Sequence, residues 1–430
     1  MDSAKKGPQA TLMTIGTIGA FFFIFGFITW LNGLLIPYLK ISCELNHFES
    51  YLVAFSFYIA YVLMAIPSSW VLKRTGLKRG MMIGLFIMAA GAVLFIPAAM
   101  TRTYFFFLSG LFIMGTGLAL LQTAANPYIT ILGPIESAAQ RISIMGICNK
   151  SAGVMATFLF GMMALKDGDA LLEKLKSMDV THKAAALDSL AARIIVPYLA
   201  MAAILILVGV MVKISGLPEI DPNVQNAGDD KEGHASRTSI FQYPFLLLGV
   251  VAIFCDVGLE IIAGDTIISY GLSQGIPISI ARHFTSLTMF ASIMGYAAGV
   301  IAIPKYISQV KALRICALLG IALAIAAISL PKLASVVFIA SLGMANALIW
   351  PSVWPLALEG LGRFTRIGSS LLIMGNLGGA LLPLLYGRLA DVVSPQKAYI
   401  IVLPCYFFIL YYATLGHKVG KRAGKIPLAG

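Results

Sequence analysis

The sequence predicts an all-α polytopic membrane protein with twelve transmembrane helices arranged as two pseudo-symmetric six-helix bundles. Hydrophobic residues make up 59% of the 430 residues and charged residues only 12%, whereas about a quarter of a soluble globular domain is charged. The mean hydropathy is +0.88. Apolar runs of membrane-spanning length recur along the chain, and one polar stretch divides them into six and six.

The first apolar run extends from about Thr11 to Leu39. It is longer than the ~7 to 15 apolar residues of a signal-peptide core and is followed by no small-residue cleavage site, so we expect an uncleaved helix. Windows of about twenty apolar residues then predict all the spans: 14–39, 50–72, 80–100, 104–131, 140–165, 194–215, 243–272, 280–304, 311–330, 333–359, 367–389 and 397–416. They imply an N-terminal bundle (1–215), a cytoplasmic linker (216–240) and a C-terminal bundle (241–430).

Basic residues in the short connections fix the expected orientation. The positive-inside rule places these connections, and both termini, in the cytoplasm of a cell bounded by a bacterial inner membrane. The loops account for the net charge of +12, so no nucleic-acid partner is indicated. The residues concerned are Lys73, Arg74, Lys78, Arg79, Lys305, Lys311, Arg314, Arg363 and Arg366.

The outward loop 166–193 contains apolar residues at helical spacing, which predicts a short amphipathic surface helix: Leu171, Leu172, Leu175 and Met178. The five cysteines have neither disulfide nor metal spacing and are expected to be packing residues.

A weak internal repeat supports two related halves. Asn126-Pro127 and Met145-Gly146 recur in altered form as Trp354-Pro355 and Met374-Gly375, and Asn149 matches Asn376 at a similar offset. The same offset pairs Glu260 with Asn32, so both are expected at one depth, facing a central cavity. Chance similarity among Gly, Pro and Met in apolar helices is the alternative.

Three acidic residues lie within the apolar segment 251–270: Asp256, Glu260 and Asp265. A carboxylate near the bilayer centre costs at least ~2.5 kcal/mol on insertion scales, so such residues usually have a function. Asp256 and Glu260, four residues apart, share a helix face, and Asp265 joins them only if the helix breaks near Gly264. A structural ion pair for Glu260 and a helix-end position for Asp265 are the alternatives.

Lys150 is the basic residue deep in an apolar segment, so it needs a counter-ion or must be neutral. An ion pair with Glu260 or Asp256 would give a coupling device, because protonation of the acid would break it. A static structural pair, or a lysine that snorkels to the inner surface, is the competing interpretation.

Amides dominate the remaining intramembrane polar residues: Asn32, Gln122, Asn126, Asn149, Asn346 and Asn376. An amide both donates and accepts without a charge to desolvate, which suits a neutral polyhydroxylated ligand such as a sugar. Trp30 and Trp350 can pack on the C–H face of a pyranose ring. For Tyr38 and Tyr128 a position at the membrane interface is an equal alternative.

The segments LNGLLIPYL (31–39), LLQTAANPYITILGP (120–134) and VGLEIIAGDTIISYG (257–271), with LKRTGLKRG (72–80), resemble the fucose and glucose/galactose permease family of the major facilitator superfamily (MFS). The resemblance extends over nearly the whole chain and is nearer to the glucose/galactose branch. It implies the MFS fold, alternating access around a central site, and monosaccharide import driven by a cation, usually a proton.

Two departures from that family pattern change the expected coupling route. Fucose permease carries important acids at positions matching Gly33 and Gln122, both uncharged here. The coupling role is therefore assigned to Glu260, with Asp256, Asp265 and Lys150 as further coupling residues. The ion is expected to be H⁺, with Na⁺ as the alternative because carboxylate and amide oxygens bind hard cations.

The sequence thus predicts a proton-coupled importer of a hexose, with glucose or galactose preferred, that works as a monomer in the lipid bilayer. The predicted sugar-binding residues are Asn32, Gln122, Asn126, Asn149, Asn376, Trp30, Trp350 and Glu260. No cofactor or bound metal is expected, and the five histidines lack ligand spacing, so an enzyme is not indicated. The rival functions are a Na⁺-coupled sugar symporter and a drug or lipid exporter, and the latter would need a mainly apolar cavity.

Overall fold

The computed structural model describes residues 8–131, 137–164, 168–214 and 239–420. Within these ranges the regular structure is helical, and eleven stretches are long and apolar enough to cross a membrane. The longest, His47–Thr101, contains Gly76 with φ 77° and ψ 167°, a backbone conformation that interrupts a helix. This stretch therefore holds the second and third predicted spans, so the described helices account for all twelve.

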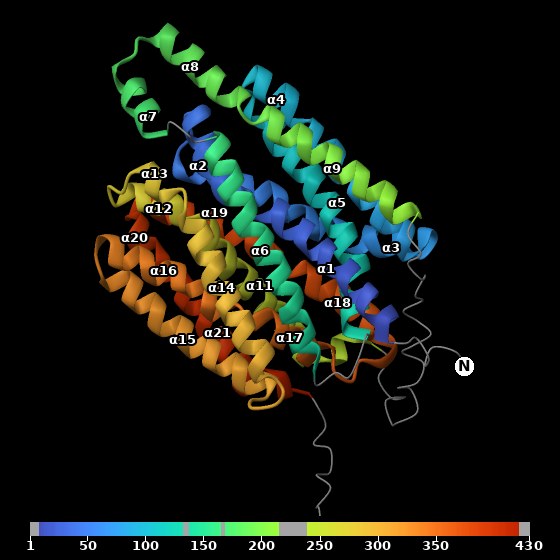
Figure 1. Ribbon diagram of the computed structural model, residues 1–430. Coiled ribbons are helices and arrows are strands. Elements are labelled where there is room, and N and C mark those ends of the chain that lie inside the picture. The colour runs from blue at the N-terminus through green and yellow to red at the C-terminus, as the bar shows by residue number, and fades with distance from the viewer. Residues whose placement is uncertain (1–7, 132–136, 165–167, 215–238, 421–430) are drawn as a thin grey trace, which may run out of the picture.

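Before the predicted linker, the first span is divided into two helices, α1 and α2, and two short helices, α7 and α8, lie at the surface (Figure 1). Helices α7 and α8 follow α6 and precede α9 along the chain. The amphipathic surface helix predicted for the loop 166–193 is confirmed as α7, whereas α8 was not predicted. The bounds are α1 Pro8–Trp30, α2 Asn32–Ser42, α3 His47–Val93, α4 Phe95–Thr101, α5 Tyr104–Ile131, α6 Ala138–Ala164, α7 Gly168–Ser177, α8 Val180–Ala192 and α9 Ile195–Ile214.

The helices after the linker are more often interrupted, and short 3-10 turns occur at 240–242, 362–364, 399–401 and 416–418. The helical bounds are α11 Pro244–Asp265, α12 Ile267–Ser273, α13 Ile278–Ala281, α14 Phe284–Ala302, α15 Gln309–Ser329, α16 Lys332–Asn346, α17 Ile349–Leu358, α18 Thr365–Met374, α19 Leu377–Val392, α20 Pro395–Ala398 and α21 Val402–Thr414. The linker itself lies almost wholly outside the described residues, so the domain boundaries stay a prediction.

Several predicted spans are each formed by two helices with a break between them, among them α1/α2, α11/α12, α16/α17 and α18/α19. Breaks inside a membrane are tolerated where the freed backbone is buried in protein or lines a polar site. Polar residues predicted from the sequence lie at these breaks, among them Asp265 as the last residue of α11 and Asn376 just before α19.

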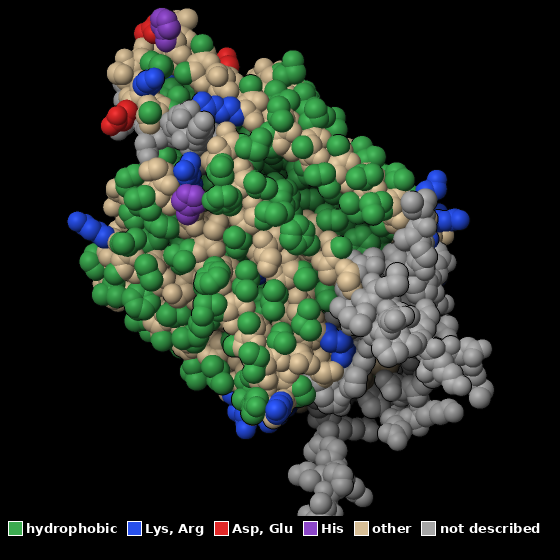
Figure 2. All heavy atoms as spheres, in the orientation of Figure 1, with side chains coloured by type: hydrophobic (Ala, Val, Ile, Leu, Met, Phe, Trp, Pro, Cys, Tyr) green, Lys and Arg blue, Asp and Glu red, His purple; other side chains and the backbone are tan. Residues whose placement is uncertain are grey.

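The outer surface is that of a protein embedded in lipid. Hydrophobic side chains cover most of the visible face, and Lys and Arg side chains gather toward the ends of the molecule (Figure 2). Large apolar side chains such as Ile66, Leu207 and Phe290 are more than half exposed. An exposed apolar surface of this extent is stable only against hydrocarbon.

The two halves meet along α3 with α19 and along α6 with α14. We call the end of the bundle that carries α2, α7, α8, α12 and α13 the upper end, as drawn in Figure 1. There the rings of Tyr51 and Tyr386 pack edge to face at 5.7 Å, and the Phe48 N–H donates to Asp391 Oδ2 at 3.0 Å. The upper end is therefore closed by contacts between the halves.

Candidate functional site

An ion pair joins the halves deep inside the bundle. The Lys150 ammonium on α6 donates to Glu260 Oε1 on α11. The Lys150 side chain is only 2% exposed, whereas Glu260 keeps 25% exposure although its neighbours along α11 are buried. The predicted pair is thus confirmed and a snorkelling lysine is excluded, and the acid is the member that remains accessible.

Trp30 at the end of α1 ties this pair to an amide. The Lys150 ammonium lies 3.7 Å from the centroid of the Trp30 ring, a cation–π geometry, and Trp30 Nε1 donates to Asn149 Oδ1 at 2.9 Å. Asn149 in turn donates through Nδ2 to the Phe22 carbonyl at 3.3 Å. Trp30, Asn149, Lys150 and Glu260 therefore form one connected polar unit, which we call the central cluster.

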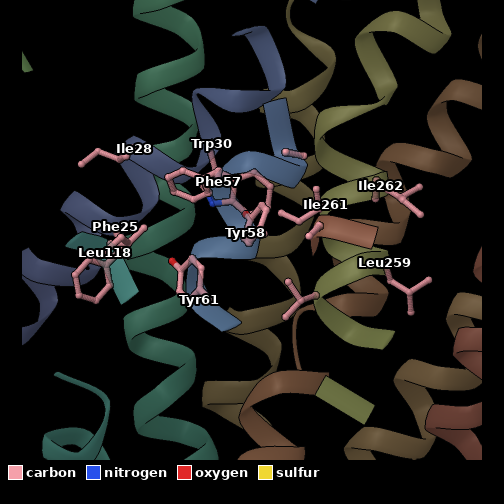
Figure 3. Close-up of a cluster of buried hydrophobic side chains, with 14 of the residues drawn as sticks. Phe25, Ile28, Trp30, Phe57, Tyr58, Tyr61, Leu118, Leu259, Ile261 and Ile262 are labelled. Atoms are coloured by element: carbon pink, nitrogen blue, oxygen red, sulfur yellow. The ribbon is translucent and has the colours of Figure 1, made fainter. Parts of the chain in front are cut away.

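Glycines make room for the Trp30 ring. A Cβ atom added at Gly153 of α6 or Gly264 of α11 would lie 2.7 Å from an atom of the ring, closer than packed carbons approach. Trp30 belongs to a cluster of buried hydrophobic side chains that also includes Phe57 and Tyr58 of α3 (Figure 3). With 1% exposure the ring is fixed by packing, and its face is taken by Lys150 rather than free to stack on a sugar.

The two other acids of α11 are buried on either side of Glu260. Asp256 is 3% exposed, its Oδ1 has no hydrogen-bond partner among the described residues, and the peptide group of Trp350 lies beside it. Asp265 is fully buried and neither of its oxygens has a described partner. Lys150 lies within electrostatic range of all three acids. The break expected near Gly264 lies after Asp265, at the end of α11, so helical spacing keeps Asp265 on a different face from Asp256 and Glu260.

The remaining predicted residues make no described hydrogen bond, ion pair or ring contact with the central cluster, or their side chains lie outside the described residues. Gln122 on α5 is half-buried and makes no hydrogen bond to a described residue. Trp350 is partly exposed and stacks on Trp354 with centroids 5.2 Å apart. Asn376 is buried and donates to the Ile373 carbonyl at 2.9 Å. The side chains of Asn32 and Asn126 lie outside the described residues.

Two buried tyrosines of α3, which pack against α19 of the other half, were not predicted from the sequence. Tyr58 packs against Gly379 of α19 and lies within electrostatic range of Glu260 and Asp265. Tyr51 packs on Gly387 and lies beside Ser269. Their spacing of seven residues, which places both on one helix face, was the available signal. Tyr38 is fully buried and donates to the Leu190 carbonyl of α8, so its ring packs inside the protein and does not face the lipid.

Comparison with known proteins agrees with this architecture. The family model described as Major Facilitator Superfamily matches residues 17–383. The glucose/galactose transporter of Brucella abortus (biovar 1, strain 9-941) is 34% identical over 404 residues, 92% of each chain. The L-fucose-proton symporter of Escherichia coli (strain K12) is 28% identical over 420 residues, 96% of this chain and 95% of its own. The crystal structure of the E. coli fucose:proton symporter FucP gives a TM-score of 0.72 at 25% identity, covering 94% of this chain and 98% of that one.

Two helical halves joined by a buried ion pair, together with the family match, define a membrane transporter and not an enzyme. The chain belongs to the Major Facilitator Superfamily. The fold predicted from the sequence is therefore confirmed.

Proposed function

We propose that this protein imports a monosaccharide, with glucose or galactose as the preferred substrate, in symport with H⁺. The observation that carries the proposal is the Lys150–Glu260 ion pair between the halves, directly beside the Asn149 amide. The named activities of the relatives, glucose/galactose transport and L-fucose-proton symport, support the substrate class and the coupling ion.

The sugar would bind where accessible polar groups surround the central cluster. Glu260 can accept hydrogen bonds from hydroxyls, and the uncommitted amide of Gln122 can both donate and accept. Trp30 holds Asn149 in one orientation, so Asn149 can bind a hydroxyl without a further loss of side-chain conformational entropy. Trp350 offers a partly exposed aromatic face for the C–H side of the ring. Asn32, Asn126 and Asn376 remain proposed hydroxyl ligands.

Proton coupling would act through the accessible member of the ion pair. A proton that binds the Glu260 carboxylate removes its charge, so the attraction that holds α6 to α11 at this point is lost. Lys150 then keeps its contact with the Trp30 ring and lies within range of Asp256. Protonation thereby shifts the equilibrium between two arrangements of the halves, which is what coupling of proton binding to transport requires.

We propose that the upper end faces the outside of the cell and that both termini lie in the cytoplasm of a cell with a bacterial inner membrane, as the positive-inside rule predicts from the basic connections. In this orientation the structure is closed to the outside, whereas a second matched structure of FucP, also with a TM-score of 0.72, is described as being in the outward conformation. Alternating access would then exchange the contacts of α3 with α19 for an open upper end. We propose a monomer with halves 1–215 and 241–430 joined by the linker 216–240.

The test is uptake of labelled glucose into proteoliposomes under an imposed pH gradient, an imposed Na⁺ gradient, or neither, with unlabelled galactose, fucose and N-acetylglucosamine as competitors. A membrane potential of 100 mV gives about 2.3 kcal/mol per charge, enough to concentrate a neutral sugar roughly 40-fold at one charge per cycle. Accumulation driven by the pH gradient is expected. If uptake strictly required Na⁺, the coupling ion would be Na⁺ and not H⁺. If glucose were not taken up and no competitor acted, the hexose assignment would be refuted.

The variant Glu260→Gln separates coupling from binding. It is expected to lose accumulation and keep sugar exchange, because glutamine can bind hydroxyls but cannot carry a proton. Asp188→Asn is the matched control, since Asp188 is 64% exposed in a surface pair with Arg102. Accumulation at the wild-type level by Glu260→Gln would remove Glu260 from the coupling mechanism.

A further inference from the structure

Asp265 is a buried acid that the proposed coupling step does not use. It is the last residue of α11, is 0% exposed, and has no described hydrogen-bond partner for either carboxylate oxygen. A carboxylate in such surroundings is very unfavourable unless it is paired or neutralised. Its position at the C-terminal end of a 22-residue helix adds to the cost, because that end of the helix dipole is negative.

Two unpartnered hydroxyls lie in the same region. Ser269 follows Asp265 by four residues through a helical break, so the two side chains share a face of α11/α12. Tyr51 comes from α3 of the other half, and its hydroxyl lies close enough to the Ser269 hydroxyl for the two to interact, although neither makes a hydrogen bond of normal geometry with a described residue. We call Asp265, Ser269 and Tyr51 the Asp265 cluster. Its three members come from both halves of the protein.

Other hydroxyls packed around this point are already committed to backbone carbonyls. Thr285 of α14 donates to the Gly264 carbonyl at 2.7 Å and Thr288 donates to the Ala263 carbonyl at 3.2 Å. Thr266 donates to the Ile262 carbonyl at 2.7 Å. They are therefore not positioned to stabilise an ionised Asp265, whereas a protonated Asp265 carries no charge that needs such partners.

The charged and titratable groups around Asp265 do not neutralise it. Lys150 on α6 acts on it from a distance but is engaged by Glu260 and Trp30. Glu260 on α11 adds like charge. From α3 the groups are Tyr51 and Tyr58, and around Tyr51 lie Tyr386 and Asp391 of α19 and Tyr399. Protonation removes the charge of the Asp265 carboxylate and so makes this side chain compatible with complete burial.

We propose that the Asp265 cluster is a proton-binding site which loads as the upper end closes, an inference that goes beyond the coupling proposed for Glu260 and concerns the closure of the upper end itself. When α3 lies away from α11/α12, water reaches Asp265 and the carboxylate is ionised. Closure brings Tyr51 over it, and one H⁺ from the medium adds to a carboxylate oxygen to give the neutral acid. Opening releases the same proton to water, so closure and proton uptake are linked.

The test measures closure without sugar, gradient or transport. Hydrogen–deuterium exchange of segments 47–58 and 265–276 in lipid nanodiscs is compared at about pH 5.5 and about pH 8.5, after correction for the intrinsic dependence of exchange on pH. The wild type is expected to exchange about tenfold faster at the higher pH, because ionised Asp265 opens the upper end. Asp265→Asn, which is always neutral, is expected to be protected equally at both pH values.

Controls separate this cluster from its neighbours. Ser269→Ala and Tyr51→Phe should move the transition toward higher pH, because less polar surroundings disfavour the carboxylate further. His47→Gln and Asp391→Ala, at the same end, should leave a pH-dependent step in place, as should Glu260→Gln. Full pH dependence in Asp265→Asn would overturn the proposal, and so would closure produced by Na⁺ at the higher pH. Because no sugar is present, failure of the hexose assignment would leave these results unchanged.

Discussion

The Lys150 ammonium lies 3.7 Å above the centre of the Trp30 ring, and the same ring donates its N–H to Asn149 at 2.9 Å. Lys150 and Asn149 are neighbours on α6, so one aromatic side chain from α1 holds both a charge and an amide. Since Lys150 also donates to Glu260 on α11, the ring, the amide and the ion pair respond together to any movement between the halves.

Trp30→Phe should weaken sugar binding. Phenylalanine keeps an aromatic face for Lys150 but lacks the N–H that orients Asn149. Loss of one buried hydrogen bond costs about 0.5 to 1.5 kcal/mol, so an increase in the sugar Kd of up to about tenfold is expected. Binding of labelled glucose to purified protein measures it. Trp70→Phe is the control, because Trp70 is 58% exposed; an unchanged Kd in Trp30→Phe would show that Asn149 needs no such support.

Lys150→Met should lower stability, and Lys150→Met with Glu260→Leu should restore much of it. Breaking a fully buried pair costs about 3 to 5 kcal/mol, whereas replacement of both charges by apolar groups is often neutral. Because Glu260 retains 25% exposure, we expect a loss of about 1 to 3 kcal/mol from the single change. Thermal unfolding in detergent checks this, with exposed Lys311→Met as control. A double variant less stable than the single one would argue against the ion-pair explanation.

Gly26→Ala should disrupt folding. A Cβ atom at Gly26 would lie 1.9 Å from the Asn149 carbonyl oxygen, which is backbone and cannot move aside without separating α1 from α6. The matched control is Gly16→Ala on the same helix, because nothing lies within 4 Å of that added atom. The yield of monodisperse protein after size-exclusion chromatography is the measurement. Equal yields for the two variants would contradict the close packing of these helices.

Asp391→Ala should favour opening of the upper end. Asp391 of α19 accepts a hydrogen bond from the Phe48 N–H, one of the free donors in the first turn of α3. Losing a cap of this kind costs about 0.5 to 2 kcal/mol, which corresponds to a roughly 2- to 30-fold shift in the open population. Faster hydrogen–deuterium exchange at the start of α3 is the expected readout. Asp188→Ala should show none, and protection unchanged in Asp391→Ala would exclude this contact as a latch.

Glu44 gives a small pH dependence of stability. The hydrogen bond from Lys183 lowers the pKa of Glu44, so the stabilisation is present above the unfolded pKa of about 4.3 and is lost as the pH falls through the folded value. Both side chains are exposed, at 38% and 54%, so solvent limits the pair to less than about 1 kcal/mol. Glu44→Gln should lower Tm by at most about 2 °C at neutral pH and by less near pH 4. Glu173→Gln is the control, and a larger loss would mean that the pair is not solvent-screened.

The sequence by itself determined the membrane architecture. Apolar runs of fixed length are dictated by bilayer thickness, and every backbone group in lipid must be satisfied within a helix, so pattern alone gives the spans. It also singled out Lys150 and Glu260, because charges inside apolar segments stand out whatever their contacts. Short helices and breaks within spans were predicted less well: α8 was missed, and the breaks before Ile267 and Leu377 fall inside spans predicted as continuous.

Only the tertiary structure decided which polar residues meet. Lys150 and Glu260 are 110 residues apart, and Trp30 and Asn149 are 119 apart, so their contacts depend on how α1, α6 and α11 pack. The same packing covers the Trp30 face with Lys150 and places Tyr51 beside Ser269, which no local pattern encodes. Helix formation depends on neighbours a few residues away, whereas partner choice between helices depends on close packing across the whole bundle.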